Sequence, residues 1–145
     1  MTLEEVERMA KDIKYITVDI KSLKKELREL EADRKYYRTS ILSDMPKGKG
    51  VYTNLSDDFL ERQQQLNEMI KYAKKKRDQE LKRFNEYLDT IEDMEIKRII
   101  QYRCLKDMHW EEIGELLGMH RTTVSKKYYN FFNVSHNSHR NCGNI

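Results

Sequence analysis

The stretch Trp110-Glu-Glu-Ile-Gly-Glu-Leu-Leu-Gly-Met-His-Arg-Thr-Thr-Val-Ser-Lys-Lys-Tyr-Tyr129 decides the fold of the carboxyl-terminal part of the chain. Apolar residues recur at helical spacing on both sides of Gly118, a residue that readily adopts the left-handed conformation that ends a helix. These apolar residues are Ile113, Leu116 and Leu117 before the glycine and Val124 and Tyr128 after it. The stretch therefore predicts two helices that cross steeply around a glycine turn and bury their apolar faces against each other.

The second predicted helix presents hydroxyl groups and positive charge on its outer face. Between His120 and Phe132 the chain has cations and no carboxylate, whereas a solvated surface helix usually mixes both signs. Short hydroxyls beside long cations suit base edges that are flanked by phosphates. We therefore expect this helix to contact double-stranded DNA. The candidate residues are His120, Arg121, Thr122, Thr123, Ser125, Lys126 and Lys127.

The alternative interpretation is an ordinary helical hairpin in a small bundle, because amphipathic pairs around a glycine are common. Two observations favour the DNA-binding helix-turn-helix. One is the small residue Gly114, four positions before Gly118, where the two helices would approach most closely. The other is the one-sided charge of the second helix.

The first part of the chain carries a heptad seam. From Val6 to Ile41 apolar residues recur in alternating steps of three and four, with Arg34 in the one vacant place. Thr2 and Glu5 form a capping box at its start. The pattern predicts a continuous helix of about 40 residues, roughly 60 Å long. Such a helix needs a partner for its apolar stripe.

A loop is expected over residues 43–55, where Pro46, Gly48 and Gly50 cluster. A second long helix should begin near residue 56. Its seam is weaker than the first and includes one stutter in the heptad pattern. The seam positions are Leu66, Ile70, Ala73, Arg77, Leu81, Phe84, Leu88 and Ile91.

The simplest arrangement of the two long helices is an antiparallel coiled-coil hairpin over residues 1–90, in which one stripe buries the other. Apolar residues at its edges, among them Tyr15, Val18, Tyr36 and Leu60, would stay partly exposed. We therefore expect self-association through the hairpin, as a homodimer.

A third helix signal begins at Thr90, which can cap a helix from Ile91 to Leu105. With the two helices of the glycine turn it predicts a three-helix head over residues 91–132. The expected core of the head comprises Ile96, Ile99, Ile100, Trp110, Ile113, Leu117, Val124 and Tyr128. Residues 133–145 have no apolar period and are expected to form a disordered polar tail. The predicted fold class is all-α.

Composition narrows the classes of protein. With 145 residues, 38% hydrophobic and 37% charged, the chain cannot bury a large core, and its net charge of +3 is too small to hold it on nucleic acid without local clustering. No apolar stretch is long enough for a membrane span or a signal peptide, so a cytoplasmic location and no membrane partner are expected. Cys104 and Cys142 predict no structural disulfide, and Cys104 is expected to be a small buried thiol.

Motifs for catalysis are not found: there is no Gly-rich phosphate loop, no His-Glu-x-x-His and no nucleophile elbow. We expect no enzyme activity and no cofactor. His136, His139 and Cys142 have the spacing of a metal clip but no fourth ligand nearby, so no metal is expected. The stretch 71–83 has seven basic and two acidic residues; it could follow a DNA backbone or form a solvated coiled-coil face.

The segments 96–114 and 118–125 resemble the head of sigma-region-four-like regulators encoded by phages of Gram-positive bacteria, above all the late-gene transcription regulators of the RinA and ArpU type. The resemblance covers residues 91–132. It implies that the second helix lies in the major groove of DNA in a bacterial host cell. The implied base contacts are Arg121, Thr122, Ser125 and Lys126, and the implied phosphate contacts are His120, Thr123 and Lys127.

The chain departs from this family in two respects. His109 and His120 stand where serine or threonine commonly caps the helices of the motif, and Gly114 replaces the usual alanine. Histidine caps poorly, so both helices are expected to begin softly, although an imidazole could instead meet a phosphate.

The resemblance also implies RNA polymerase as a partner. Glu111, Glu112 and Glu115 form an acidic face on the first helix of the motif. This face could meet a basic protein surface, or it could be a solvated face whose carboxylates are favoured by the helix dipole.

The leading hypothesis is a sequence-specific DNA-binding transcription regulator of phage or prophage genes, in which the hairpin pairs two protomers. Two alternatives remain open. One is the DNA-recognition small subunit of a phage packaging terminase. The other is a coiled-coil structural or adaptor protein.

Overall fold

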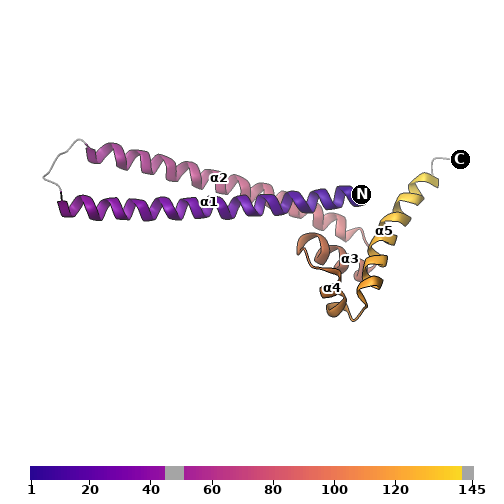
Figure 1. Ribbon diagram of the computed structural model, residues 1–145. Coiled ribbons are helices and arrows are strands. Elements are labelled where there is room, and N and C mark those ends of the chain that lie inside the picture. The colour runs from indigo at the N-terminus through magenta and orange to yellow at the C-terminus, as the bar shows by residue number, and fades with distance from the viewer. Residues whose placement is uncertain (45–50, 142–145) are drawn as a thin grey trace. The chain divides into compact units, whose positions relative to one another are not determined.

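The computed structural model describes residues 1–44 and 51–141, and the side chains of residues 1–34 and 57–134 (Figure 1). Every regular element in these ranges is helical, which confirms the all-α prediction. The elements are α1 (Leu3–Asp44), α2 (Val51–Asp89), α3 (Met94–Ile100), the π-helical turn η1 (Gln101–Leu105), α4 (Trp110–Leu117) and α5 (Arg121–Asn141). None of the helices in the described ranges combines the length and the apolar character that a membrane span requires.

The chain packs into two compact units whose limits differ from the predicted boundary at residue 90. The head unit joins residues 1–15 to the chain from Gln79 onward, and the hairpin unit comprises residues 16–78. The observed limits differ from the predicted one because the amino-terminal turns of α1 and the last turns of α2 contribute to the core of the head unit.

In the hairpin unit the predicted seams form the inner faces of α1 and α2, and α2 runs back alongside α1 (Figure 1). Ile20, Leu66 and Ile70 are buried, whereas Leu23 and Leu27 are half-buried. Outside the seam, Arg62 of α2 forms an ion pair with Glu26 of α1. The apolar edges Val18 and Leu60 are exposed, as predicted. Two facing helices thus bury one stripe each.

The predicted loop at 43–55 is too long. Helix α1 ends at Asp44 and α2 begins at Val51, five residues before the predicted start. The earlier start is consistent with the sequence, because no glycine or proline occurs between Val51 and Asp89. Residues 45–50, and the side chain of Tyr36, lie outside the described residues.

The head unit closes around one apolar core. The predicted core residues are buried or packed against it, with Ile99, Ile100, Ile113, Val124 and Tyr128 among the buried ones. Further buried residues come from α1 and α2, from the residues after α2, from η1 and from α5: Val6, Ala10, Ile13, Phe84, Leu88, Ile91, Cys104 and Phe132. One prediction was wrong, because Leu116 is 61% exposed and does not join this core.

The third helix begins later than predicted. Thr90 ends α2, because its side-chain hydroxyl donates to the carbonyl oxygen of Tyr87 at 2.6 Å. Asp93 caps α3 instead, and its carboxylate accepts the backbone N–H of Glu95 at 2.9 Å. The predicted single helix up to Leu105 is α3 followed by η1.

The carboxyl-terminal segment was predicted to be disordered from residue 133. This prediction was wrong for residues 133–141, because α5 continues to Asn141 and contains no glycine or proline. Phe132 is the last buried residue among the described side chains, and Asn133 and Val134 after it are exposed.

Candidate nucleic-acid interface

Two glycines fix the turn between α4 and α5. Gly118 has φ 69° and ψ 33°, and its N–H donates to the carbonyl oxygen of Gly114. The N–H of Met119 donates to the same oxygen at 2.9 Å. A Cβ atom on Gly114 would lie 2.4 Å from the carbonyl oxygen of Met119, so the close approach of the turn requires glycine there. An alanine at position 114 would force this backbone to move.

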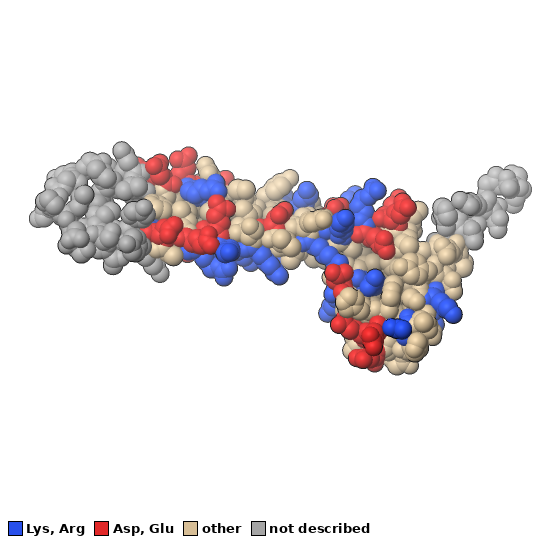
Figure 2. Space-filling view, viewed as in Figure 1, with Lys and Arg blue, Asp and Glu red and all other residues tan. Residues whose placement is uncertain are grey.

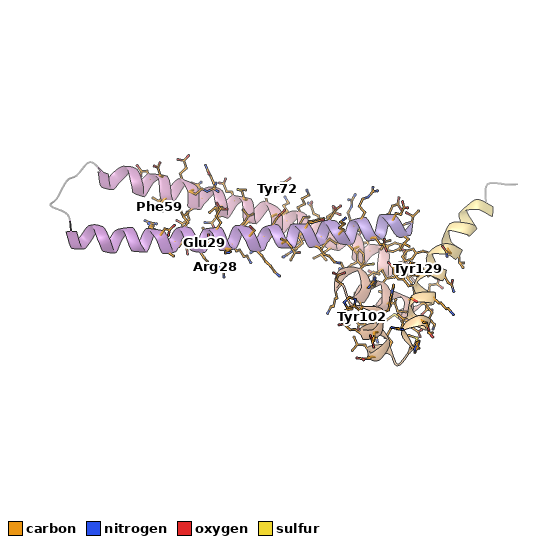
Figure 3. The ribbon with its side chains drawn as sticks, in the orientation of Figure 1. Arg28, Glu29, Phe59, Tyr72, Tyr102 and Tyr129 are labelled. Carbon is orange, nitrogen blue, oxygen red and sulfur yellow. The ribbon has the colours of Figure 1, made fainter. Side chains whose placement is uncertain are left out.

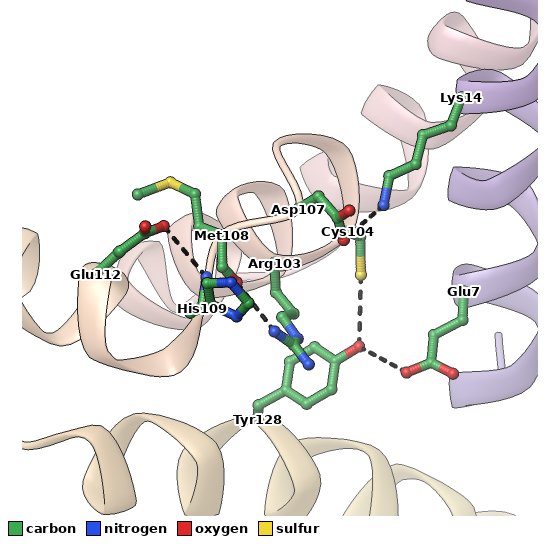
Figure 4. Close-up of polar contacts among 9 residues, drawn as sticks. All are labelled: Glu7, Lys14, Arg103, Cys104, Asp107, Met108, His109, Glu112 and Tyr128. Carbon is green, nitrogen blue, oxygen red and sulfur yellow. Dashed lines mark hydrogen bonds and ion pairs between the residues drawn. The ribbon is translucent and has the colours of Figure 1, made fainter. Parts of the chain in front are cut away.

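The start of α4 is held by contacts of Arg103 and Glu112, whose hydrogen bonds to Met108 and His109 are drawn in Figure 4. The guanidinium carbon of Arg103 lies 4.3 Å from the centroid of the Trp110 ring, and its Nη1 donates to the carbonyl oxygen of Met108 at 3.0 Å. The carboxylate of Glu112 accepts the N–H of His109 at 3.3 Å. A residue of the first turn therefore compensates for the weak capping expected of His109.

The start of α5 is capped by His120 itself, which corrects the expectation of a soft start. Its Nδ1 accepts the backbone N–H of Thr122 at 3.3 Å and lies 2.8 Å from the hydroxyl oxygen of that residue. An imidazole nitrogen takes the place that a serine or threonine oxygen usually fills. The contact orders both side chains at the beginning of the candidate interface.

The first two turns of α5 carry exposed cations and hydroxyls. Arg121, Thr122, Thr123 and Lys126 are exposed, while Val124 on the opposite face is fully buried. Within the described part of the chain, the side chains of Arg121 and Lys126 have no hydrogen-bond or ion-pair partner. These two cations are free to bind an external anion.

Besides His120 and Thr122, two predicted contact residues are engaged within the protein. The hydroxyl of Ser125 donates to the carbonyl oxygen of Thr122 at 3.1 Å, and the residue is half-buried. The ammonium of Lys127 forms an ion pair with the carboxylate of Glu95 on α3. The carboxylate of Glu95 therefore lies at the edge of the outer face of α5. The candidate interface is smaller than predicted, because Lys127 is already paired.

The outward face continues past the predicted residues to Tyr129 and Asn130, which are both exposed. Tyr129, labelled in Figure 3, is 45% exposed. Its ring lies edge-on to Trp110, with 6.0 Å between the ring centroids. Sequence reasoning missed both residues. The signal was present, because they follow Lys126 by three and four positions and so share its helical face.

Beneath the interface, Tyr128 anchors α5 to α1 and η1. Its hydroxyl donates to the carboxylate of Glu7 at 3.3 Å and lies 3.4 Å from the Cys104 sulfur (Figure 4). Burial raises the pKa of Tyr128 and of Cys104, so both stay protonated at neutral pH. Cys104 is the small buried thiol that the sequence predicted.

Charge is divided between the two helices of the turn. Glu111, Glu112 and Glu115 are exposed on α4, and acidic side chains gather over that helix in Figure 2. After Glu115 the sequence contains no carboxylate side chain. An anionic ligand is therefore attracted to the α5 side of the head unit and repelled from the α4 side.

Among the described residues no group of three or more His, Cys, Asp and Glu side chains could hold a metal ion. The side chains of His136, His139 and Cys142 lie outside the described residues.

Comparisons of the chain with protein-family models, with curated proteins and with solved structures found no match.

Proposed function

We propose that the chain is a sequence-specific double-stranded DNA-binding protein that reads the major groove with the first turns of α5. The observation that carries this proposal is the pair of free cations, Arg121 and Lys126, on an exposed helical face whose opposite side is anchored in the core. An α-helix with its side chains is about 10–12 Å wide, which matches a major groove about 12 Å wide.

The contacts have different roles in this proposal. Arg121 and Thr122 lie at the exposed start of α5, where side chains reach base edges in helix-turn-helix proteins. Lys126 can bind a base or a phosphate, and Tyr129 offers a ring and a hydroxyl one turn further along. Because Lys127 is paired with Glu95, we assign it a smaller share of phosphate binding than the sequence suggested.

The biological role we propose, regulation of phage or prophage transcription, rests on the resemblance of residues 91–132 to late-gene regulators. The same resemblance proposes RNA polymerase as a further partner. The exposed α4 face, with Glu111, Glu115 and the 61% exposed Leu116, is the surface we assign to that contact.

Selection of random duplexes by the full chain tests sequence-specific binding. We expect enrichment of a defined motif, with a relaxed preference at one base pair for Arg121→Ala. Arg28→Ala is the matched control, because Arg28 is an exposed arginine of the hairpin unit (Figure 3). Uniform, salt-sensitive retention of all sequences would contradict the proposal and favour a structural or adaptor role.

A further inference from the structure

The outer face of α2 carries a stripe of charges that change sign at Tyr72. Tyr72 is 72% exposed and projects outward from α2 (Figure 3). Four residues before it lies Glu68 and four residues after it lies Lys76, and both are exposed. The spacing continues in steps of three and four along the helix in both directions. This α2 stripe consists of Glu61, Gln65, Glu68, Tyr72, Lys76, Gln79 and Arg83, all of them exposed.

The α2 stripe is complementary to itself when reversed. Counting outward from Tyr72, each acidic residue on one side has a basic residue at the same distance on the other, and Gln65 is matched by Gln79. We propose that the α2 stripe binds the same stripe of a second copy of this chain, with the two helices antiparallel and a two-fold axis passing beside Tyr72.

Charge decides the orientation of the pair. In the antiparallel arrangement Glu68 faces Lys76 of the second copy, and the two-fold axis repeats that contact. In a parallel arrangement Glu68 would face Glu68, and Lys76 would face Lys76, so like charges would repel each other along the whole stripe.

The centre of the stripe supplies apolar surface. Tyr72 lies on the axis, where it meets the same residue of the second copy, and Met69 beside it is 47% exposed. Both residues line a groove of the hairpin unit, together with Ile16, Leu23 and Ala73. An aromatic pair at the axis and a methionine in each groove cover surface that the two-helix unit leaves in water.

Other occupants fit the stripe less well. A solvated face has no reason to separate its charges by sign on the two sides of one aromatic residue. A DNA backbone would be attracted by Lys76 and Arg83 but repelled by Glu61 and Glu68 on the same face. Pairing of two α2 stripes does not require DNA, so the experiments that test it are made without DNA.

Cysteine cross-linking of the full chain tests the orientation, in a Cys142→Ser background with Cys104 left in the core. We expect Tyr72→Cys to form a disulfide-linked dimer, because the axis brings residue 72 beside its own copy. Gln65→Cys is the matched control: two copies of residue 65 would be about 21 Å apart along an antiparallel pair. A mixture of Gln65→Cys and Gln79→Cys should link as heterodimers. Equal self-linking at 65 and 72, or none at 72, overturns the proposal.

Sedimentation equilibrium tests the charge pairs. We expect Glu68→Lys to weaken the dimer about tenfold or more, and Glu68→Lys combined with Lys76→Glu to restore it. Glu29→Lys makes the same charge change on an exposed position of α1 and should leave the dimer constant unchanged (Figure 3). A chain that stays monomeric at all concentrations, or a double variant as weak as the single one, overturns the proposal.

Discussion

The head unit and the hairpin unit are built on the same two apolar seams and yet bury them to different extents. Among the largest side chains that are completely buried in the described parts of the chain, Leu66 alone belongs to the hairpin unit. Val6 and Phe84 lie on the same seams but are fully buried, whereas Leu27 is half-buried. In the hairpin unit the two helices enclose only some seam positions, such as Leu66, whereas in the head unit further helices also cover the seam. The hairpin unit therefore keeps apolar side chains such as Val18 and Met69 exposed.

The largest expected effect is a core truncation in the head unit. Phe84→Ala should lower the free energy of unfolding by about 3–5 kcal/mol, because Phe84 is fully enclosed. Leu27→Ala, at a half-buried seam position, should cost only about 1 kcal/mol. Urea denaturation followed by circular dichroism measures both. Equal losses would show that the hairpin seam is covered as completely as the head core.

A smaller loss is expected at the turn. Gly114→Ala should cost about 1–3 kcal/mol, because the new methyl group meets the Met119 carbonyl oxygen and the backbone must move. Gly118→Asn is the control, since no atom lies within 4 Å of a Cβ there and asparagine tolerates a positive φ. Thermal unfolding of the two variants compares them. A Gly114→Ala protein as stable as the parent would show that the helices of the turn are not closely packed.

The anchor of α5 predicts a still smaller effect. Tyr128→Phe keeps the buried ring but removes the hydroxyl that contacts Glu7 and Cys104, so we expect a loss of about 0.5–1.5 kcal/mol. Unfolding in urea gives this value. No loss, together with unchanged amide exchange in the first turns of α1, would show that the Tyr128 hydroxyl does not hold α1 to the head unit.

The smallest effect concerns pH. A hydrogen bond from Lys14 at 2.8 Å holds the pKa of Asp107 below its usual value, so the carboxylate stabilises the head unit at neutral pH. Because the folded pKa is lowered, this contribution is lost as the pH falls below about 4. Asp107→Asn should therefore be less stable than the parent at pH 7, and the difference should shrink in acid. A difference that is the same at both pH values would contradict the assignment.

Much of the fold could be predicted from periodicity, because steps of three and four mark the inner faces of both long helices. The extent of the head unit could not be predicted. Nothing local distinguishes Val6 or Ala10, which join its core, from Leu23, which does not. The start of α3 was also misplaced, because Thr90 and Asp93 are both good caps and only the fold selects between them.

In the candidate interface, too, helical spacing predicted which residues face outward but not which of them pair with distant residues. Spacing alone placed Arg121, Thr122 and Lys126 on the outer face of α5, and the same rule extends to Tyr129. The pairing of Lys127 with Glu95 was not predictable, because the two residues are 32 positions apart and meet only through the packing of α3 against α5.

Binding of a selected duplex by single-residue variants tests the central claim, that the first turns of α5 hold DNA, most directly. In fluorescence anisotropy at fixed salt, Arg121→Ala should bind the selected site about 1–3 kcal/mol more weakly than the parent and lose discrimination at one base pair. Arg28→Ala should bind like the parent. If Arg121→Ala and Lys126→Ala both bind the selected site as tightly as the parent does, α5 is not the reading helix.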